Sequence, residues 1–322
     1  MSAAMLKYRW FFGVWLVGLT VSCGASGEER PNGFDVSKAS IPVKDILDGG
    51  VGKDGIPAID RPKFLPAEKV DFMGDGETVI SFTGKNGETR AYPIRVLIQH
   101  EIVNDKYEGQ AIMVTYCPLC ASAMVFESRI GDKDLVFGVS GLLYQSDVLM
   151  YDRETQSLWT QLGMKSVSGP NVGKALKWLP SEQMSFATWK KKYPQGEVLS
   201  TDTGFMRNYQ SSGYGAYFDS PETMFPVPFT RKELPRKSYV SGVIHKGKTM
   251  AFPMRGMPRD ELIEVEVGGD KIKVIYERDT RQMKAFEADG VTSIPVVKAF
   301  WFAWQAFYPE TEIWKRGKNI ED

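Results

Sequence analysis

The sequence predicts an α+β fold that is mainly antiparallel β-sheet with a few short helices, built as two related halves from an internal duplication. Three observations predict it. Short runs alternate apolar and polar residues, glycines stand between these runs at turn positions, and the chain resembles itself at a fixed shift. The 322 residues suffice for one large domain or two smaller ones.

The internal similarity pairs residues 80–127 with residues 240–287, which align without a gap and share 13 of 48 positions. Chance would give about three identities. A second match pairs residues 189–197 with residues 304–312 at a smaller shift. The change of shift implies that the first half carries an insertion of about 45 residues.

The local pattern predicts the same elements in both halves. Alternating runs at Val79–Phe82 and Ala111–Tyr116 predict strands in the first half, and Lys271–Tyr276 predicts one in the second. Gly87 and Gly247 stand at turns between strands.

Prolines mark the predicted helices. Pro93 suits the first turn of a helix that extends to His100, because proline needs no amide donor there. Each half then closes with an aromatic helix that Pro194 or Pro309 ends.

The first residues predict export. Lys7 and Arg9 precede an apolar run, Trp10–Val21, that is too short to span a bilayer and fits the core of an export signal. The run leads into Cys23 in a pattern similar to the lipobox of bacterial lipoproteins, and the alternative is a plain secretory signal. We therefore expect a periplasmic or outer-surface lipoprotein that meets the membrane only through the lipid on Cys23.

These features divide the chain into five segments. They are an export or lipoprotein signal (1–23), a tether and loop-rich N-terminal segment (24–77), a first half with the cysteine pair and the insertion (78–200), a connecting segment (201–239), and a second half without cysteines (240–322).

The chemistry is expected at Cys117 and Cys120, a Cys-x-x-Cys turn at the end of a predicted strand. The second half has Glu277 and Thr280 at the corresponding positions, so the fold itself does not need the cysteines. Three functions remain open. Two such thiols can exchange a disulfide, they can bind Cu(I) or another soft metal, or they can form a structural disulfide across a loop too short to stabilise the fold much. Redox exchange without a cofactor is the leading hypothesis.

Six further residues are candidates for roles beside the thiols. His100 is a candidate base for a thiol, because it is the only histidine of the first half. The other five are candidate substrate-binding residues on the cysteine strand and in the insertion: Tyr116, Ser140, Tyr144, Asp152 and Trp159. The segment around Asp152 also predicts a strand–turn–strand hairpin.

The charge balance limits the kinds of partner that are expected. Forty basic and forty acidic residues cancel, so no nucleic-acid partner is expected, because such a partner would need a basic surplus. A redox role would instead give the chain a protein thiol as its partner.

Four motifs together resemble an uncharacterised prokaryotic family, the domain of unknown function numbered 3179. They are His100–Asp105, Tyr116–Cys120, and the runs Phe137–Tyr144 and Tyr151–Trp159, and the resemblance covers roughly residues 41–315. The resemblance implies no established activity. Some members of that family have selenocysteine in the Cys-Pro-Leu-Cys motif, which implies redox chemistry at these positions. The family pattern usually has glycine after the second cysteine, where this chain has Ala121.

Overall fold

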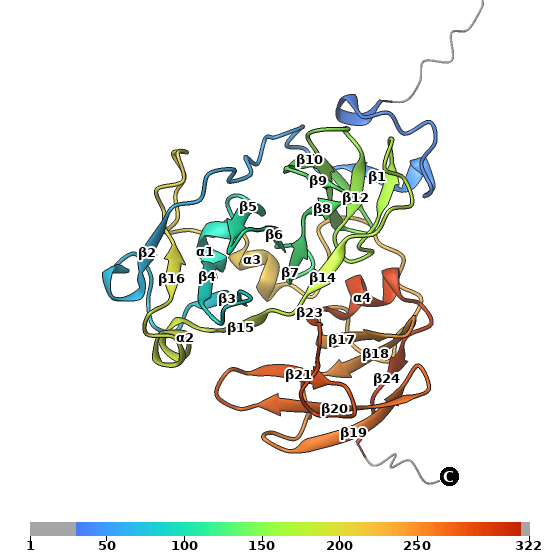
Figure 1. Ribbon diagram of the computed structural model, residues 1–322. Helices are drawn as coiled ribbons and strands as arrows, with labels where there is room; N and C mark the ends of the chain where they lie inside the picture. The colour runs from blue at the N-terminus through green and yellow to red at the C-terminus, as the bar shows by residue number, and fades with distance from the viewer. Residues whose placement is uncertain (1–29, 317–322) are drawn as a thin grey trace, which may run out of the picture.

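The computed structural model describes residues 30–316, so the predicted signal and Cys23 lie outside the described residues. The described chain is mostly antiparallel β-sheet with a few short helices, which confirms the predicted α+β class (Figure 1). Within residues 30–316, no helix is both long enough and apolar enough to cross a bilayer.

Two of the sheets are formed mainly by the first half. The first has the order β15-β3-β4-β16-β2, with β2 (Phe64–Pro66), β3 (Thr78–Thr83), β4 (Thr89–Pro93), β15 (Glu182–Ser185) and β16 (Glu197–Leu199). The second has the order β14-β7-β6-β5, with β5 (Ile102–Tyr107), β6 (Gln110–Cys117), β7 (Ser122–Glu127) and β14 (Lys177–Leu179).

The second half also has two sheets. The first has the order β23-β17-β18-β24, with β17 (Tyr239–His245), β18 (Lys248–Pro253), β23 (Val296–Phe300) and β24 (Glu312–Ile313). The second has the order β19-β20-β21-β22, with β19 (Leu262–Val267), β20 (Asp270–Glu277), β21 (Gln282–Phe286) and β22 (Ser293–Ile294). The three strands predicted from alternation therefore form, each one residue longer at both ends.

The two halves share their strand order. The hairpins β3–β4 and β17–β18 each take one antiparallel neighbour, β15 or β23, and one parallel neighbour, β16 or β24. The turns within these hairpins contain Gly87 and Gly247 with φ of 86° and 75°, a left-handed conformation that glycine adopts without a steric penalty.

A fifth large sheet distinguishes the first half. Its order is β1-β10-β11-β12-β13, with β1 (Ile46–Asp48), β10 (Phe137–Tyr144), β11 (Asp147–Asp152), β12 (Leu158–Thr160) and β13 (Ser166–Ser168). All but β1 lie between β7 and β14, together with a small hairpin of β8 (Arg129–Ile130) and β9 (Lys133–Asp134). The strands β11 and β12 are antiparallel, which confirms the hairpin predicted at Asp152.

The helices are short, and one prediction about them is wrong. They are α1 (Ile94–Leu97), α2 (Phe186–Lys192), α3 (Gly215–Asp219) and α4 (Trp301–Phe307), with 3-10 turns at Pro31–Gly33, Val43–Asp45 and Ala67–Lys69. The helix after Pro93 ends at Leu97 and does not reach His100, because the chain turns at Glu101 (φ 58°) to enter β5.

The two aromatic helices end where the prolines predict. Tyr193 and Tyr308 follow α2 and α4 with nearly identical non-helical backbone angles, φ −131° and ψ 66° against φ −128° and ψ 67°. Each precedes a proline, whose ring disfavours helical geometry in the residue before it.

One hydrophobic cluster connects the two halves and the inserted sheet. It contains the cysteine pair, Trp159 of β12, and Trp301 and Trp304 of α4. The cysteine turn therefore lies where the first half, the second half and the insertion pack together.

Candidate functional site

The cysteine pair lies on the turn between β6 and β7. Cys117 is the last residue of β6 and pairs with Ser122, the first residue of β7, so Cys120 lies within the four-residue turn between them. Both cysteines are free thiols, and they are only 1% and 0% exposed.

Ala121 closes this turn in a left-handed conformation, with φ of 51°. A β-carbon makes that conformation unfavourable, and glycine would adopt it with less strain. Arg281, which precedes β21 in the second half, has φ of 55°. The two turns thus have the same backbone requirement at their last residue.

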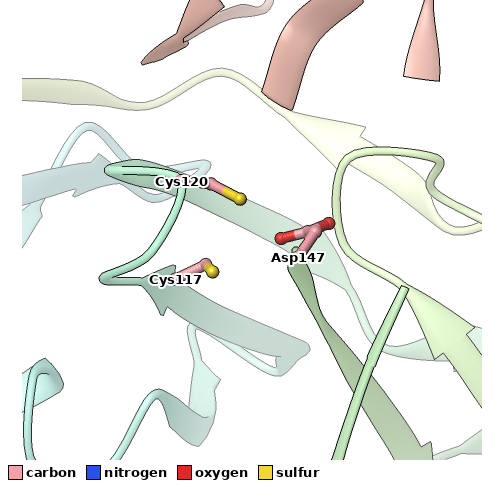
Figure 2. A group of neighbouring side chains, drawn as sticks. All are labelled: Cys117, Cys120 and Asp147. Atoms are coloured by element: carbon pink, nitrogen blue, oxygen red, sulfur yellow. The ribbon is translucent and has the colours of Figure 1, made fainter. Parts of the chain in front are cut away.

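A third side chain, Asp147, joins the two thiols. It is the first residue of β11, so the inserted sheet supplies it. Figure 2 shows the carboxylate and both sulfurs directed into the same space. One ligand atom from each residue lies within 4.8 Å of the other two, and all three residues are buried.

Asp147 was not predicted from the sequence. It opens a strand that is buried throughout, Asp147–Asp152, and a carboxylate in so apolar a run is unusual. That mismatch is the only signal in the sequence that could have identified it.

Buried polar atoms without partners occur at this point. The Asp147 Oδ2 atom accepts the Leu162 amide at 2.9 Å, but Oδ1 is buried and has no hydrogen-bond partner. The neighbouring Ser146 hydroxyl is buried and unpartnered as well, while its carbonyl oxygen accepts the Cys120 thiol at 3.2 Å. Such atoms are rare in folded proteins, and a water molecule or a bound ion usually satisfies them.

The electrostatics of the site are acidic. Burial raises the pKa of Asp147 to about 7 and that of Glu101, which is 7% exposed, to about 8. Burial also raises the pKa of Cys117 and raises that of Cys120 well above the usual value. The two carboxyl groups and the two thiols therefore share a region whose low polarity disfavours their ionised forms. A bound cation would lower the free-energy cost of ionising them.

His100 is directed to other partners. Its Nδ1 lies 2.7 Å from the carbonyl oxygen of Pro57, and its Nε2 lies 2.7 Å from the hydroxyl of Tyr209. Burial lowers the pKa of the imidazole. Both ring nitrogens are thus hydrogen-bonded to groups other than the thiols, and the next residue, Glu101, raises the pKa of Cys117 through its charge.

The two predicted tyrosines differ in their surroundings. Tyr116 precedes the first cysteine, is 5% exposed, and has a raised pKa, first because of burial and further because of nearby groups that include both cysteines. Tyr144 is half-buried and packs edge-on against Phe307 of α4 at 5.8 Å between ring centroids.

Asp152 and Trp159 hold the inserted hairpin together. Asp152 accepts the Thr155 amide at 2.6 Å and the Trp159 indole N–H at 2.8 Å. Trp159 is fully buried in the core, where it packs against Phe137.

Ser140 has a similar structural role. Its hydroxyl donates to the Leu149 carbonyl and accepts the Leu142 amide at 3.0 Å, and the residue is fully buried. These contacts bridge β10 and β11 near the irregularity in their pairing.

Comparison with known proteins places the chain in a family. A search of curated proteins and a search of solved structures each found no match. A family model described as "Protein of unknown function (DUF3179)" matches residues 53–290, which is more than half of the chain and includes the cysteine turn and all strands of the inserted sheet except β1. The chain therefore belongs to this family of proteins of unknown function, DUF3179.

Proposed function

We propose that Cys117, Cys120 and Asp147 form a metal centre and that the protein binds Zn²⁺ there. The observation that carries the proposal is the convergence of two sulfurs and a carboxylate oxygen within 4.8 Å in a buried region. The unpartnered Oδ1 of Asp147 supports it, because a metal ion would supply the missing partner.

The donor set favours zinc. Thiolate ligands suit Cu(I) and Zn²⁺, but a carboxylate oxygen is a regular ligand of Zn²⁺ and a poor match for the softer Cu(I). Three protein ligands also leave a fourth position for water or substrate, an arrangement typical of catalytic zinc sites. The positive charge would offset the cost of ionising the buried thiols and carboxylate.

We further infer that the two halves arose by duplication and that the metal centre was added to one of them. The shared strand order of the paired sheets supports this. Glu277 and Thr280 stand where the first half has its cysteines, and the insertion that carries Asp147 has no counterpart between β21 and β22.

Metal analysis tests the proposal. Protein purified without oxygen, stripped with a chelator and then loaded with Zn²⁺ should retain about one zinc per chain after desalting, because the ligand set is single. Cys117→Ser and Cys120→Ser should each lose the bound zinc. Asp279→Asn, on the corresponding turn of the second half, is the matched control and should retain it. A parallel sample is loaded with Cu(I): retention of copper but not of zinc would make Cu(I) the bound metal, and retention of neither metal would refute the proposal.

A second candidate is thiol–disulfide exchange with another exported protein. Two free thiols on one tight turn favour it, since their sulfurs lie within 4.8 Å of each other and such a pair can form a disulfide. The raised pKa values of the thiols weigh against it, because the thiolate is the reactive form. The reduction potential of the Cys117–Cys120 couple, measured with and without zinc, separates the two functions.

The N-terminal sequence supports a location for either function. We propose that the chain is exported and held at the membrane surface by a lipid on Cys23, as the apolar run that precedes this cysteine indicates.

A further inference from the structure

The connecting segment between β16 and β17, residues 200–238, contains one short helix, α3, and no strand. Most of its residues are exposed, including Phe205 and Met206 at 44% and 101%. Segments with few backbone hydrogen bonds and little burial open at a low free-energy cost.

One part of this segment is buried against the metal centre. The Tyr217 side chain of α3 is 6% exposed, and its hydroxyl donates to the carbonyl oxygen of Leu119 at 2.7 Å. Leu119 lies between the two cysteines in sequence, so this bond joins α3 directly to the cysteine turn. Burial raises the pKa of Tyr217, and the charges of Cys120 and Cys117 raise it further, which agrees with this proximity.

A second contact holds Tyr217 from the other side. The Lys237 ammonium lies 3.3 Å from the centroid of the Tyr217 ring and donates to the Tyr217 carbonyl oxygen. Phe218 packs on Phe300, whose amide donates to the Cys120 carbonyl oxygen at 2.9 Å. Side-chain contacts, not a sheet or a long helix, therefore hold α3 over the thiols.

The flanks of α3 are anchored independently. On the N-terminal side, the Tyr209 hydroxyl binds His100. On the C-terminal side, the Arg231 carbonyl oxygen accepts the Trp301 indole N–H at 3.2 Å. Gly213, just before α3, and Gly215, its first residue, are exposed and carry no side chains that would resist movement.

We propose that residues 213–220, here called the cover, open as a unit to admit a metal ion or a substrate to the buried thiols, and that the Tyr217–Leu119 hydrogen bond is the latch. The flanks stay in place while the cover moves. The inference rests on the proposed function only for the statement that a metal ion or its substrate enters. The cover would limit the access of any reagent to the thiols.

Thiol labelling of metal-free, reduced protein tests the cover. Iodoacetamide is added under native conditions, and alkylation of Cys117 and Cys120 is followed by peptide mass spectrometry. Tyr217→Phe removes the latch and keeps the ring, so labelling should accelerate about fivefold, the effect of one net hydrogen bond. Lys237→Met should also accelerate labelling. Tyr209→Phe, on the anchored flank, is the matched control and should leave the rate unchanged.

The dependence of labelling on urea gives a second measurement. Opening of the cover exposes little surface, so the rate in the wild type should respond only weakly to low urea concentrations. A response as steep as that of global unfolding would overturn the proposal, as would an equal acceleration by Tyr209→Phe or none by Tyr217→Phe. Unfolding midpoints of all variants show whether a change reflects lost global stability. The labelling uses metal-free protein, so its result does not depend on whether the protein binds zinc.

Discussion

The Cys120 thiol donates a hydrogen bond to the carbonyl oxygen of Ser146, 3.2 Å away. This bond joins the turn after β6 to the turn before β11, two segments that approach each other only in the folded chain. It places Asp147, the residue after Ser146, beside both thiols.

Asp147→Asn should weaken zinc binding about 100-fold or more, since even loss of a supporting group around a metal costs 10–100-fold in affinity. The amide keeps the shape of the carboxylate and can still accept the Leu162 amide, so the fold should be retained. Competition with a zinc chelator measures the affinity, and circular dichroism reports the fold. An affinity equal to that of the wild type would remove Asp147 from the ligand set.

Ala121→Gly should raise the free energy of unfolding by about 0.5–1 kcal/mol, because it relieves the left-handed strain at φ 51°. Urea denaturation measures this value. Ala123→Gly, in the buried strand β7, is the matched control and should lower the free energy of unfolding. A loss of stability in Ala121→Gly would show that packing of the Ala121 methyl group outweighs the strain.

His100 should make the protein less stable as the pH falls below about 6.5, its unfolded pKa. Its pKa is lowered in the folded state, so the unfolded chain binds more protons in the window below that pH, and the free energy of unfolding falls there. Urea denaturation from pH 8 to pH 5 measures the slope. His100→Gln should have a lower stability at pH 8 because it loses hydrogen bonds, and its deficit relative to the wild type should shrink as the pH falls below 6.5. Parallel profiles for the two proteins would contradict this assignment.

Cys23→Ser should release the exported protein from the membrane fraction. Lipidation needs the cysteine sulfur, whereas removal of a plain secretory signal does not. Detergent phase partitioning of the wild type and the variant, together with the mass of the mature N-terminus, measures the outcome. If both proteins stay in the aqueous phase, the signal is a plain secretory one.

Local sequence patterns were sufficient for most of the fold. Strands, glycine turns and proline-ended helices depend on residues close together in the chain, so the strands at Val79–Phe82 and Ala111–Tyr116 and the end of α4 before Pro309 could be predicted. The extent of α1 could not, because the left-handed turn at Glu101 is imposed by the entry into β5.

The sequence by itself determined that two cysteines share one turn, since that follows from their spacing. Only the tertiary structure decided what surrounds them. The inserted sheet brings Asp147 to the thiols, α3 brings Tyr217 over them, and His100 forms hydrogen bonds with Pro57 and Tyr209. These contacts join distant segments through packing and buried hydrogen bonds, and no periodicity within a single segment encodes them.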